Sequence, residues 1–267
     1  MDAKFSLRSA GAGVSTVIAM TLLAGTANAD HAWANYHWAR ASNPFTLALG
    51  DNLSSVWDPY LQTTSSDWSV SNVLETTIVA GGTTARRCRA ATGRVEVCNA
   101  AYGNNGWLGI ASISVNGSHI RSGTVRVNDT YFNTAQYNTP AWRNLVMCQE
   151  VGHIFGLDHQ DENFNNSNLG SCMDYTNSPS SNQHPNGHDY EQLQIIYSHN
   201  DGSSLTAAAA DRDVPPAMDQ LYLAGPAQWG RVVSRYTDGR PKIYELDFGR
   251  GHKIITHVFW APGANRR

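Results

Sequence analysis

The chain has 267 residues, with 19 Lys and Arg against 22 Asp and Glu, which gives a net charge of −3. This near-neutral balance does not favour nucleic acid or a charged surface as a partner. The length is enough to bury a full hydrophobic core, in one domain or in one domain with a small appendix.

Residues 1–29 have the features of a secretory signal peptide. Lys4 and Arg8 precede the apolar run Val14–Ala24, and Ala27-Asn28-Ala29 provides a cleavage site. The apolar run is about half of the ~20 residues that a membrane-spanning helix needs, so a membrane anchor is the less favoured alternative. We therefore expect a secreted, extracellular protein with no membrane contact after signal removal.

The chain contains four cysteines, which fit an oxidising, extracellular compartment. Four cysteines allow three pairings. The favoured pairing joins Cys88 to Cys98, which flank a short Gly-containing stretch, and Cys148 to Cys172, which bracket the candidate site described below.

The first half of the mature chain is predicted to be rich in strands. Asp30–Pro44 is aromatic and is expected to pack on the domain, although His31 and His37 could bind a metal instead. Alternation, β-branched residues and turn signals then predict further elements. These are a strand at Phe45–Gly50, a helix within Ser54–Ser66, a strand at Val73–Ala80, a hairpin over Arg86–Asn99, and strands at Trp107–Val115 and Thr124–Asn128.

A helix is predicted over Ala141–Phe155. Thr139 can cap it, and Pro140 suits the first helical position. Its apolar residues recur at helical spacing and are expected to face the core: Leu145, Cys148, Val151 and Phe155.

The same helix carries the candidate site. Gln149 and His153 are four residues apart and share one face, with Glu150 beside them. Gly156 can adopt a positive φ and turn the chain, which would bring His159 back toward the same point. Three converging side chains with an adjacent carboxylate form an open zinc site with a general base. The alternative is that Glu150 is an ordinary exposed helix residue.

Gln149–His159 reads Gln-Glu-Val-Gly-His-Ile-Phe-Gly-Leu-Asp-His. It resembles the H-E-x-x-H-x-x-G-x-x-H signature of the metzincin metalloproteases, with Gln149 in place of the first His. Ser171–Thr176 resembles the Met-turn of that superfamily, and it places Met173 and Tyr175 at the Met and the metal-proximal Tyr of astacins and serralysins.

The resemblance implies a matrixin-like α+β catalytic domain over residues 30–200. Such a domain has a twisted, mostly parallel sheet with an antiparallel edge strand, an active-site helix, a Met-turn and a C-terminal helix, for which His188–His199 is the candidate. The edge strand pairs with an extended peptide or protein substrate. Leu108–Val115 is the candidate for this edge, and an ordinary inner strand is the equal alternative.

The resemblance also implies a function and a role for each site residue. The function is that of a secreted zinc-dependent endopeptidase, expected to be a monomer. The roles are metal ligation by Gln149, His153 and His159, general base catalysis by Glu150, oxyanion stabilisation by Tyr175, and an apolar floor under the metal formed by Met173.

Gln149 departs from the signature, because its amide oxygen is a harder donor than imidazole and zinc prefers nitrogen and sulfur. Three outcomes are open. Gln149 ligates through oxygen, another residue such as His184 or His188 completes the site, or the site is empty. In the last case the protein is a pseudo-protease that binds a partner without hydrolysis.

Three segments complete the sequence predictions. The polar loop Gln160–Gly170 could bind calcium through its oxygens, although a plain solvated loop is favoured. Residues 201–225 are predicted to be a linker. Residues 226–267 are predicted to form a small basic β meander that either docks on the main domain or binds a partner. Its expected strands are Val232–Tyr236, Lys242–Phe248 and Lys253–Trp260.

Overall fold

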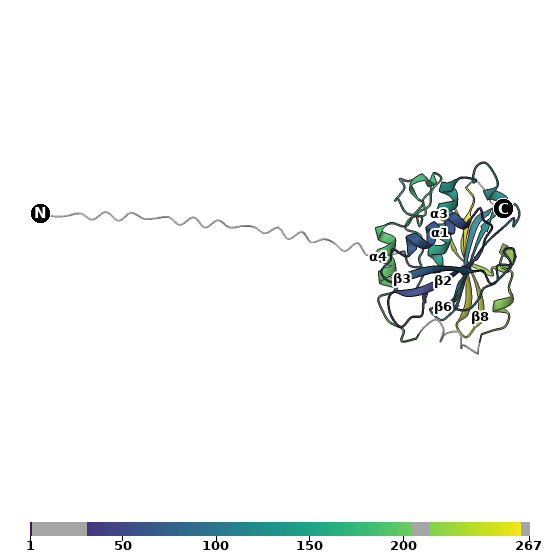
Figure 1. Cartoon of the computed structure of the whole chain (residues 1–267), viewed down its shortest axis with the longest axis horizontal. Coiled ribbons are helices and arrows are strands. Elements are labelled where there is room, and N and C mark those ends of the chain that lie inside the picture. The colour runs from purple at the N-terminus through teal and green to yellow at the C-terminus, as the bar shows by residue number, and fades with distance from the viewer. Residues whose placement is uncertain (2–30, 204–213, 263–267) are drawn as a thin grey trace.

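The computed structural model describes Met1, residues 31–203 and residues 214–262 (Figure 1). The predicted signal peptide lies outside these residues apart from Met1, as does part of the predicted linker. Among the described residues, no helix is both long enough and apolar enough to cross a membrane.

One nine-stranded sheet organises the molecule, in the order β3-β2-β4-β6-β5-β9-β8-β7, with β1 also paired to β6. The strands are β1 (His37–Trp38), β2 (Phe45–Asn52), β3 (Leu74–Ala80), β4 (Val95–Ala100), β5 (Trp107–Asn116), β6 (His119–Asn128), β7 (Arg231–Arg235), β8 (Pro241–Gly249) and β9 (His252–Trp260). The helices are α1 (Asp58–Trp68), α2 (Asp129–Phe132), α3 (Pro140–Ile154) and α4 (Gly187–Ile196), with short 3-10 turns at Pro179–Ser181, Met218–Gln220 and Pro226–Gln228.

The fold is α+β, as predicted. Strands β3, β2, β4 and β6 run parallel, and β5 is antiparallel to β6. Helices α1 and α3 lie side by side (Figure 1), with α3 against β5 and β6 and α1 against β3. This arrangement sets α3, which carries the candidate site, directly over the centre of the sheet.

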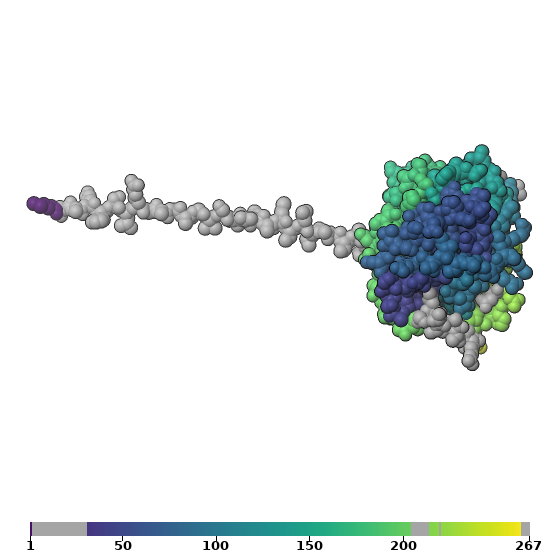
Figure 2. Space-filling model, in the orientation of Figure 1, coloured from purple at the N-terminus to yellow at the C-terminus, as the bar shows by residue number. Residues whose placement is uncertain are grey.

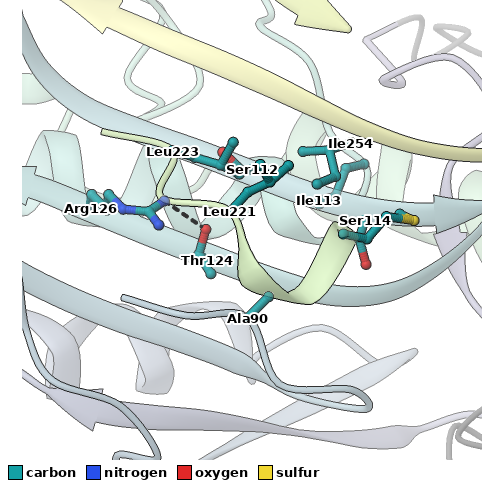
Figure 3. A pocket seen from close by; sticks show the side chains of 10 residues that line it. Ala90, Ser112, Ile113, Ser114, Thr124, Arg126, Leu221, Leu223 and Ile254 are labelled. Atoms are coloured by element: carbon teal, nitrogen blue, oxygen red, sulfur yellow. Dashed lines mark hydrogen bonds between the residues drawn. The ribbon is translucent and has the colours of Figure 1, made fainter. Parts of the chain in front are cut away.

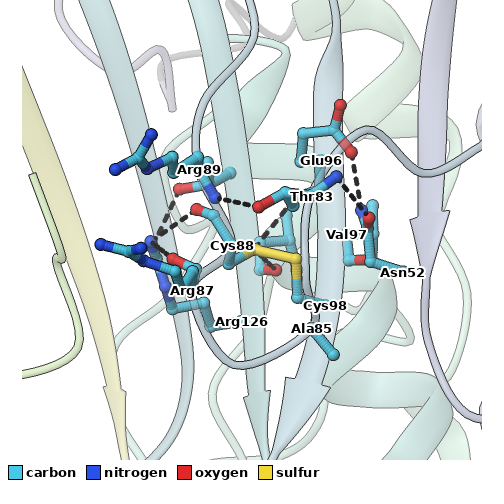
Figure 4. Close-up of a disulfide and its surroundings, with 12 residues drawn as sticks. Asn52, Thr83, Ala85, Arg87, Cys88, Arg89, Glu96, Val97, Cys98 and Arg126 are labelled. Atoms are coloured by element: carbon cyan, nitrogen blue, oxygen red, sulfur yellow. Dashed lines mark hydrogen bonds between the residues drawn. A yellow bond between two sulfur atoms is a disulfide. The ribbon is translucent and has the colours of Figure 1, made fainter. Parts of the chain in front are cut away.

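The hairpin predicted over Arg86–Asn99 is wrong. Only β4 is a strand there, and it is parallel to both β2 and β6. Both of its edges are therefore paired, which leaves no place for a return strand. The preceding loop is fixed instead by the Cys88–Cys98 disulfide and by Arg126, whose guanidinium donates to the Cys88 carbonyl at 2.8 Å (Figure 4).

Both favoured disulfide pairings are confirmed. Cys88 bridges Cys98 and Cys148 bridges Cys172, each pair with its Cα atoms 5.9 Å apart. The second bridge connects α3 to the segment that carries Met173.

The predicted C-terminal meander is confirmed as β7, β8 and β9, which pair antiparallel in sequence order. It docks on the main domain by strand pairing, because β9 runs antiparallel along the whole of β5. The candidate edge strand Leu108–Val115 is consequently an inner strand. A sequence pattern cannot show this, since pairing with a strand far along the chain depends on the whole sheet.

The sheet is covered on both faces. The main core lies on the α1 and α3 side, and a second cluster on the other face packs Met218, Leu223 and Trp229 over β5 and β9. A small pocket lies on this second face, between Leu221 and Leu223 and the polar strand residues Ser112 and Arg126 (Figure 3).

Helix α3 begins as predicted. The Thr139 side chain accepts a hydrogen bond from the Trp142 amide, and Pro140 occupies the first turn. From Leu145 to Ile154 every side chain is buried, so polar Gln149, Glu150 and His153 lie inside the protein. On a helix that is buried on all sides, each polar side chain must have a hydrogen-bond partner or serve a function, because burial without either is costly.

Gly156 ends α3 in the left-handed region, with φ of +94°, and a Cβ there would lie 2.2 Å from the Tyr36 carbonyl oxygen. Gly156→Ala is expected to lower the free energy of unfolding by about 2–6 kcal/mol, from backbone strain and steric overlap together. Gly103 is the matched control, because its φ is +101° but open space surrounds it. Gly103→Ala should cost only the strain, about 1–3 kcal/mol. Urea unfolding with the disulfides intact measures both, and equal losses would contradict the steric explanation.

Candidate metal centre

His153 projects from the last turn of α3 and is 1 % exposed. Its Nδ1 lies 2.8 Å from the Leu157 carbonyl oxygen, which can only accept a hydrogen bond. Nδ1 therefore carries the proton, and Nε2 presents a lone pair. A hydrogen bond on the far nitrogen is the usual way in which a protein orients a metal-binding imidazole.

His159 returns to His153 as the sequence predicts. The two Nε2 atoms lie 3.1 Å apart. The turn is held by two backbone bonds, from the Asp158 amide to the His31 carbonyl (2.6 Å) and from the Gln160 amide to the Met173 carbonyl (2.8 Å). Two imidazole nitrogens at this separation are joined by a proton or by a shared metal ion.

His257 completes the cluster, although no motif in the sequence predicts it as a ligand. It comes from β9, and its ring centroid lies 3.9 Å from that of His153 and 4.7 Å from that of His159. One ring nitrogen from each of the three histidines lies within 4.8 Å of the other two. All three side chains are buried.

A signal for His257 was present in the sequence. Along β9, His257 alternates in phase with Ile255 and Phe259, which both belong to the main core. A histidine on the core-facing side of a strand is a candidate functional residue. Only the register of β9 against β5, in which His257 pairs with Ala111, places it beside α3.

Gln149 is buried, and its amide nitrogen donates to the Cys172 carbonyl at 2.8 Å. Its Oε1 is buried without a hydrogen-bond partner. The other two alternatives from the sequence lie elsewhere: His184 pairs with Asp67 at 2.7 Å, and His188 stacks on His31. Neither belongs to the three-histidine cluster.

Glu150 is 0 % exposed, so the alternative of an exposed helix residue is wrong. Neither carboxylate oxygen has a hydrogen-bond partner, and Oε2 lies 3.8 Å from Nδ1 of His257. Gly109 makes room for it, because a Cβ at that position would lie 2.7 Å from Oε1. Burial raises the pKa of Glu150 well above its usual value. An unpartnered buried carboxylate is costly and is typical of functional sites.

The imidazoles are electrostatically prepared to bind a cation. Burial lowers the pKa of His153 to about 4 and lowers the pKa values of His159 and His257 well below the usual value. All three are therefore neutral near pH 7, which is the form that coordinates a metal.

Two tyrosines lie against this cluster. The Tyr175 ring is 4.3 Å from the His159 ring, and its hydroxyl hydrogen-bonds to that of Tyr236. The Tyr236 hydroxyl also lies 3.0 Å from Nε2 of His257 and 2.8 Å from the Val258 carbonyl oxygen. Burial raises the pKa of both hydroxyls well above the usual value, so both remain protonated donors.

Met173 is fully buried and packs against α3. A Cβ on Gly152 would lie 2.6 Å from the Met173 sulfur, so a glycine is needed there for this close approach. Trp33 closes another side, with its ring edge-to-face to those of His153 (5.7 Å) and His257 (6.2 Å).

The calcium site considered for Gln160–Gly170 is not supported. Asp161 accepts hydrogen bonds from the Asn163 amide and the Asn166 side chain within the loop itself. Asp158 and Glu162 lie near His159, but both carboxylates are ion-paired to the Lys242 ammonium. Asp161 is therefore used within the loop, and the carboxylates nearest His159 already share a lysine.

The fold and site together define an α+β protein with a buried centre of three histidines and one glutamate. The sequence matches no protein-family model and no curated protein. Among solved structures it is similar to myroilysin, with a TM-score of 0.37 and 12 % identity over 63 % of this chain and 85 % of that one. It is also similar to high choriolytic enzyme 1, a hatching enzyme zinc-protease from Oryzias latipes (medaka fish), with a TM-score of 0.33 and 10 % identity over 61 % of this chain and 94 % of that one. Because these values are low, the proposals below depend on the geometry of this chain alone.

Proposed function

We propose that this chain is a secreted zinc-dependent endopeptidase in which His153, His159 and His257 hold the metal. The observation that carries the proposal is the convergence of three buried, neutral imidazoles beside the unpartnered carboxylate of Glu150. Three protein nitrogens with one open position form the donor set of a catalytic zinc. The donor set therefore fits this metal.

His257 replaces Gln149 in the proposed ligand set. Imidazole nitrogen suits zinc better than an amide oxygen does. The amide nitrogen of Gln149 is already committed to the Cys172 carbonyl, which supports a role for Gln149 in joining α3 to the segment before Met173. In this proposal the third imidazole, which the helix lacks, comes from β9, near the C-terminus.

The residues around the centre have the chemistry of peptide hydrolysis. A bound zinc would supply Lewis acidity, polarising a carbonyl and acidifying a water molecule. Glu150, whose pKa is raised by burial, is suited to accept a proton from that water and pass it to the leaving amine. The Tyr175 hydroxyl, beside His159, is a protonated donor that can stabilise negative charge on the carbonyl oxygen, whereas the Tyr236 hydroxyl donates its proton to the Val258 carbonyl.

A second candidate function is a non-catalytic metal-binding protein, and one observation favours it. Strand β9 occupies the side of β5 that was expected to pair with substrate. Glu150 and the imidazoles are also buried, so a peptide reaches them only after the residues around the centre open. Both candidate functions include the bound metal, and they differ in whether the centre opens to a peptide.

Metal analysis and a peptidase assay on the full chain separate these candidates. We expect His159→Ala to hold one zinc fewer per chain than the unsubstituted protein. We also expect cleavage of a quenched fluorescent peptide library that a chelator abolishes and added zinc restores. Zinc loss in the variant without any peptidase activity would favour the non-catalytic protein. Equal zinc in the two proteins would overturn the centre itself.

A further inference from the structure

A second cluster of metal-binding side chains lies away from the three-histidine centre, where the N-terminal segment meets the chain after α4. It contains His37 of β1, His119 at the start of β6, and His199 and Asp201. In the space-filling view the purple N-terminal residues lie beside green residues near α4 (Figure 2). The proposed function makes no use of this cluster.

Its nitrogen and oxygen atoms converge closely. Nε2 of His37 lies 3.1 Å from Nε2 of His199 and 3.3 Å from Oδ1 of Asp201. The same Oδ1 lies 3.2 Å from Nε2 of His199 and 3.2 Å from Nε2 of His119. Ligand atoms around a tetrahedral zinc are about 3.3 Å apart, given metal–ligand bonds of about 2.0–2.1 Å. The separations among His37, His199 and Asp201 match that spacing, whereas His119 lies outside the group whose ligand atoms are all within 4.8 Å of one another and approaches it through Oδ1 of Asp201.

Surrounding groups orient these atoms toward one another. Nδ1 of His37 donates to the Asn35 carbonyl at 2.8 Å, which leaves its Nε2 with a lone pair. Oδ2 of Asp201 accepts from the Arg40 guanidinium (2.9 Å) and the Arg40 amide (3.2 Å), which turns Oδ1 to the imidazoles. The side chains of His37 and Asp201 are largely buried, at 8 % and 7 % exposed. Bonds of this kind to the outer atoms of ligands are typical of metal sites.

An ordinary histidine–aspartate ion pair accounts poorly for this arrangement. Arg40 already neutralises Asp201 through Oδ2. A proton on His199 can join the two Nε2 atoms, which lie 3.1 Å apart, but it leaves the His37 lone pair facing Oδ1 of Asp201 at 3.3 Å. A single cation shared by the lone pairs satisfies the nitrogens and Oδ1 at once.

We propose that His37, His199 and Asp201 bind a structural zinc ion, and that the ring of His119, whose Nε2 lies 3.2 Å from Oδ1 of Asp201, turns in as the fourth ligand. His119 and His199 are about half exposed, at 43 % and 50 %, so both rings can adjust to the ion. A site with four protein ligands is closed and stabilises the fold, unlike a catalytic site with an open position. It would join the N-terminal segment to the chain after α4.

The segment that the proposed zinc ion would hold also contacts the three-histidine centre. The segment held by His37 also contributes Trp33, which packs on His153 and His257, and the His31 carbonyl, which holds the Asp158 amide. The proposed ion would anchor residues 31–40 against these contacts. Its role is therefore structural, and its loss should be visible in thermal stability.

Metal content of the purified full chain tests the proposal. We expect two zinc ions per chain, one in His199→Ala, one in His159→Ala and none in the double variant. His184→Ala is the matched control, because His184 is equally exposed (55 %) and also pairs with an aspartate, yet lies outside both clusters. It should keep two. His199→Ala with undiminished zinc would overturn the proposal. If His159→Ala alone keeps its zinc, the first centre fails and this site stands.

Chelation gives a readout independent of activity. In His159→Ala, which retains only the second site, a chelator should lower the Tm and added zinc should restore it. The double variant with His199→Ala should show no such shift. Cobalt in His159→Ala should give the visible absorption of a tetrahedral nitrogen and oxygen site. A chelator shift of equal size in both variants would overturn the structural role.

Discussion

Glu150→Gln is expected to lower kcat/KM for peptide hydrolysis by about 10²–10⁴-fold, the usual contribution of a positioned general base. Glutamine has nearly the shape of a neutral carboxyl group, so the buried space beside Gly109 remains filled. It cannot accept the proton that Glu150 would take. Zinc content should be unchanged, because Glu150 is not one of the proposed ligands. Parallel measurement of peptidase rate and zinc content checks both expectations.

Glu191→Gln is the control, since Glu191 is an exposed carboxylate on α4 and does not belong to the three-histidine cluster. Its activity and zinc content should equal those of the unsubstituted chain. If Glu150→Gln retained full activity, Glu150 would have no catalytic role and the assignment of the general base would be lost. A loss of zinc in that variant would instead indicate a structural or ligating role.

His257→Ala should weaken zinc binding at the first centre by at least about 100-fold. Removing a residue that only supports a ligand costs about 10–100-fold, and removing a ligand costs at least as much. Gln149→Met, which keeps the side-chain length but has no amide, should change zinc affinity by less than about threefold. It should still lower stability by about 1–3 kcal/mol, because the buried Cys172 carbonyl loses this donor.

Competition with a chromophoric chelator measures these affinities in a His199→Ala background, where only the first centre binds. His252→Ala is the control, because His252 is equally buried on the same strand but is its first residue and pairs with Asn116, whereas His257 lies in the middle of the strand and pairs with Ala111. It should leave the affinity unchanged. If Gln149→Met weakened zinc binding and His257→Ala did not, the third ligand would be Gln149 of the helix and not His257.

Part of the candidate site could be predicted because it depends on short-range geometry. The four-residue spacing of Gln149 and His153, the Thr139 cap and the turn at Gly156 are properties of one helix and its end. They direct the chain so that His159 returns toward His153, and the backbone bonds of this turn to His31 and Met173 then hold it there. The two disulfides could also be predicted, since four cysteines allow few pairings.

The sequence by itself thus determined the helix, two of the three imidazoles of the centre, the adjacent carboxylate and the three-stranded C-terminal meander. The tertiary structure alone decided that the meander continues the sheet, that β5 is an inner strand, and that His257 rather than His184 or His188 joins the cluster. Helical spacing and turns are fixed by the backbone of neighbouring residues. The partner of a sheet edge depends on the competition among all strands to bury their faces and pair their backbones, so no local pattern of residues records it.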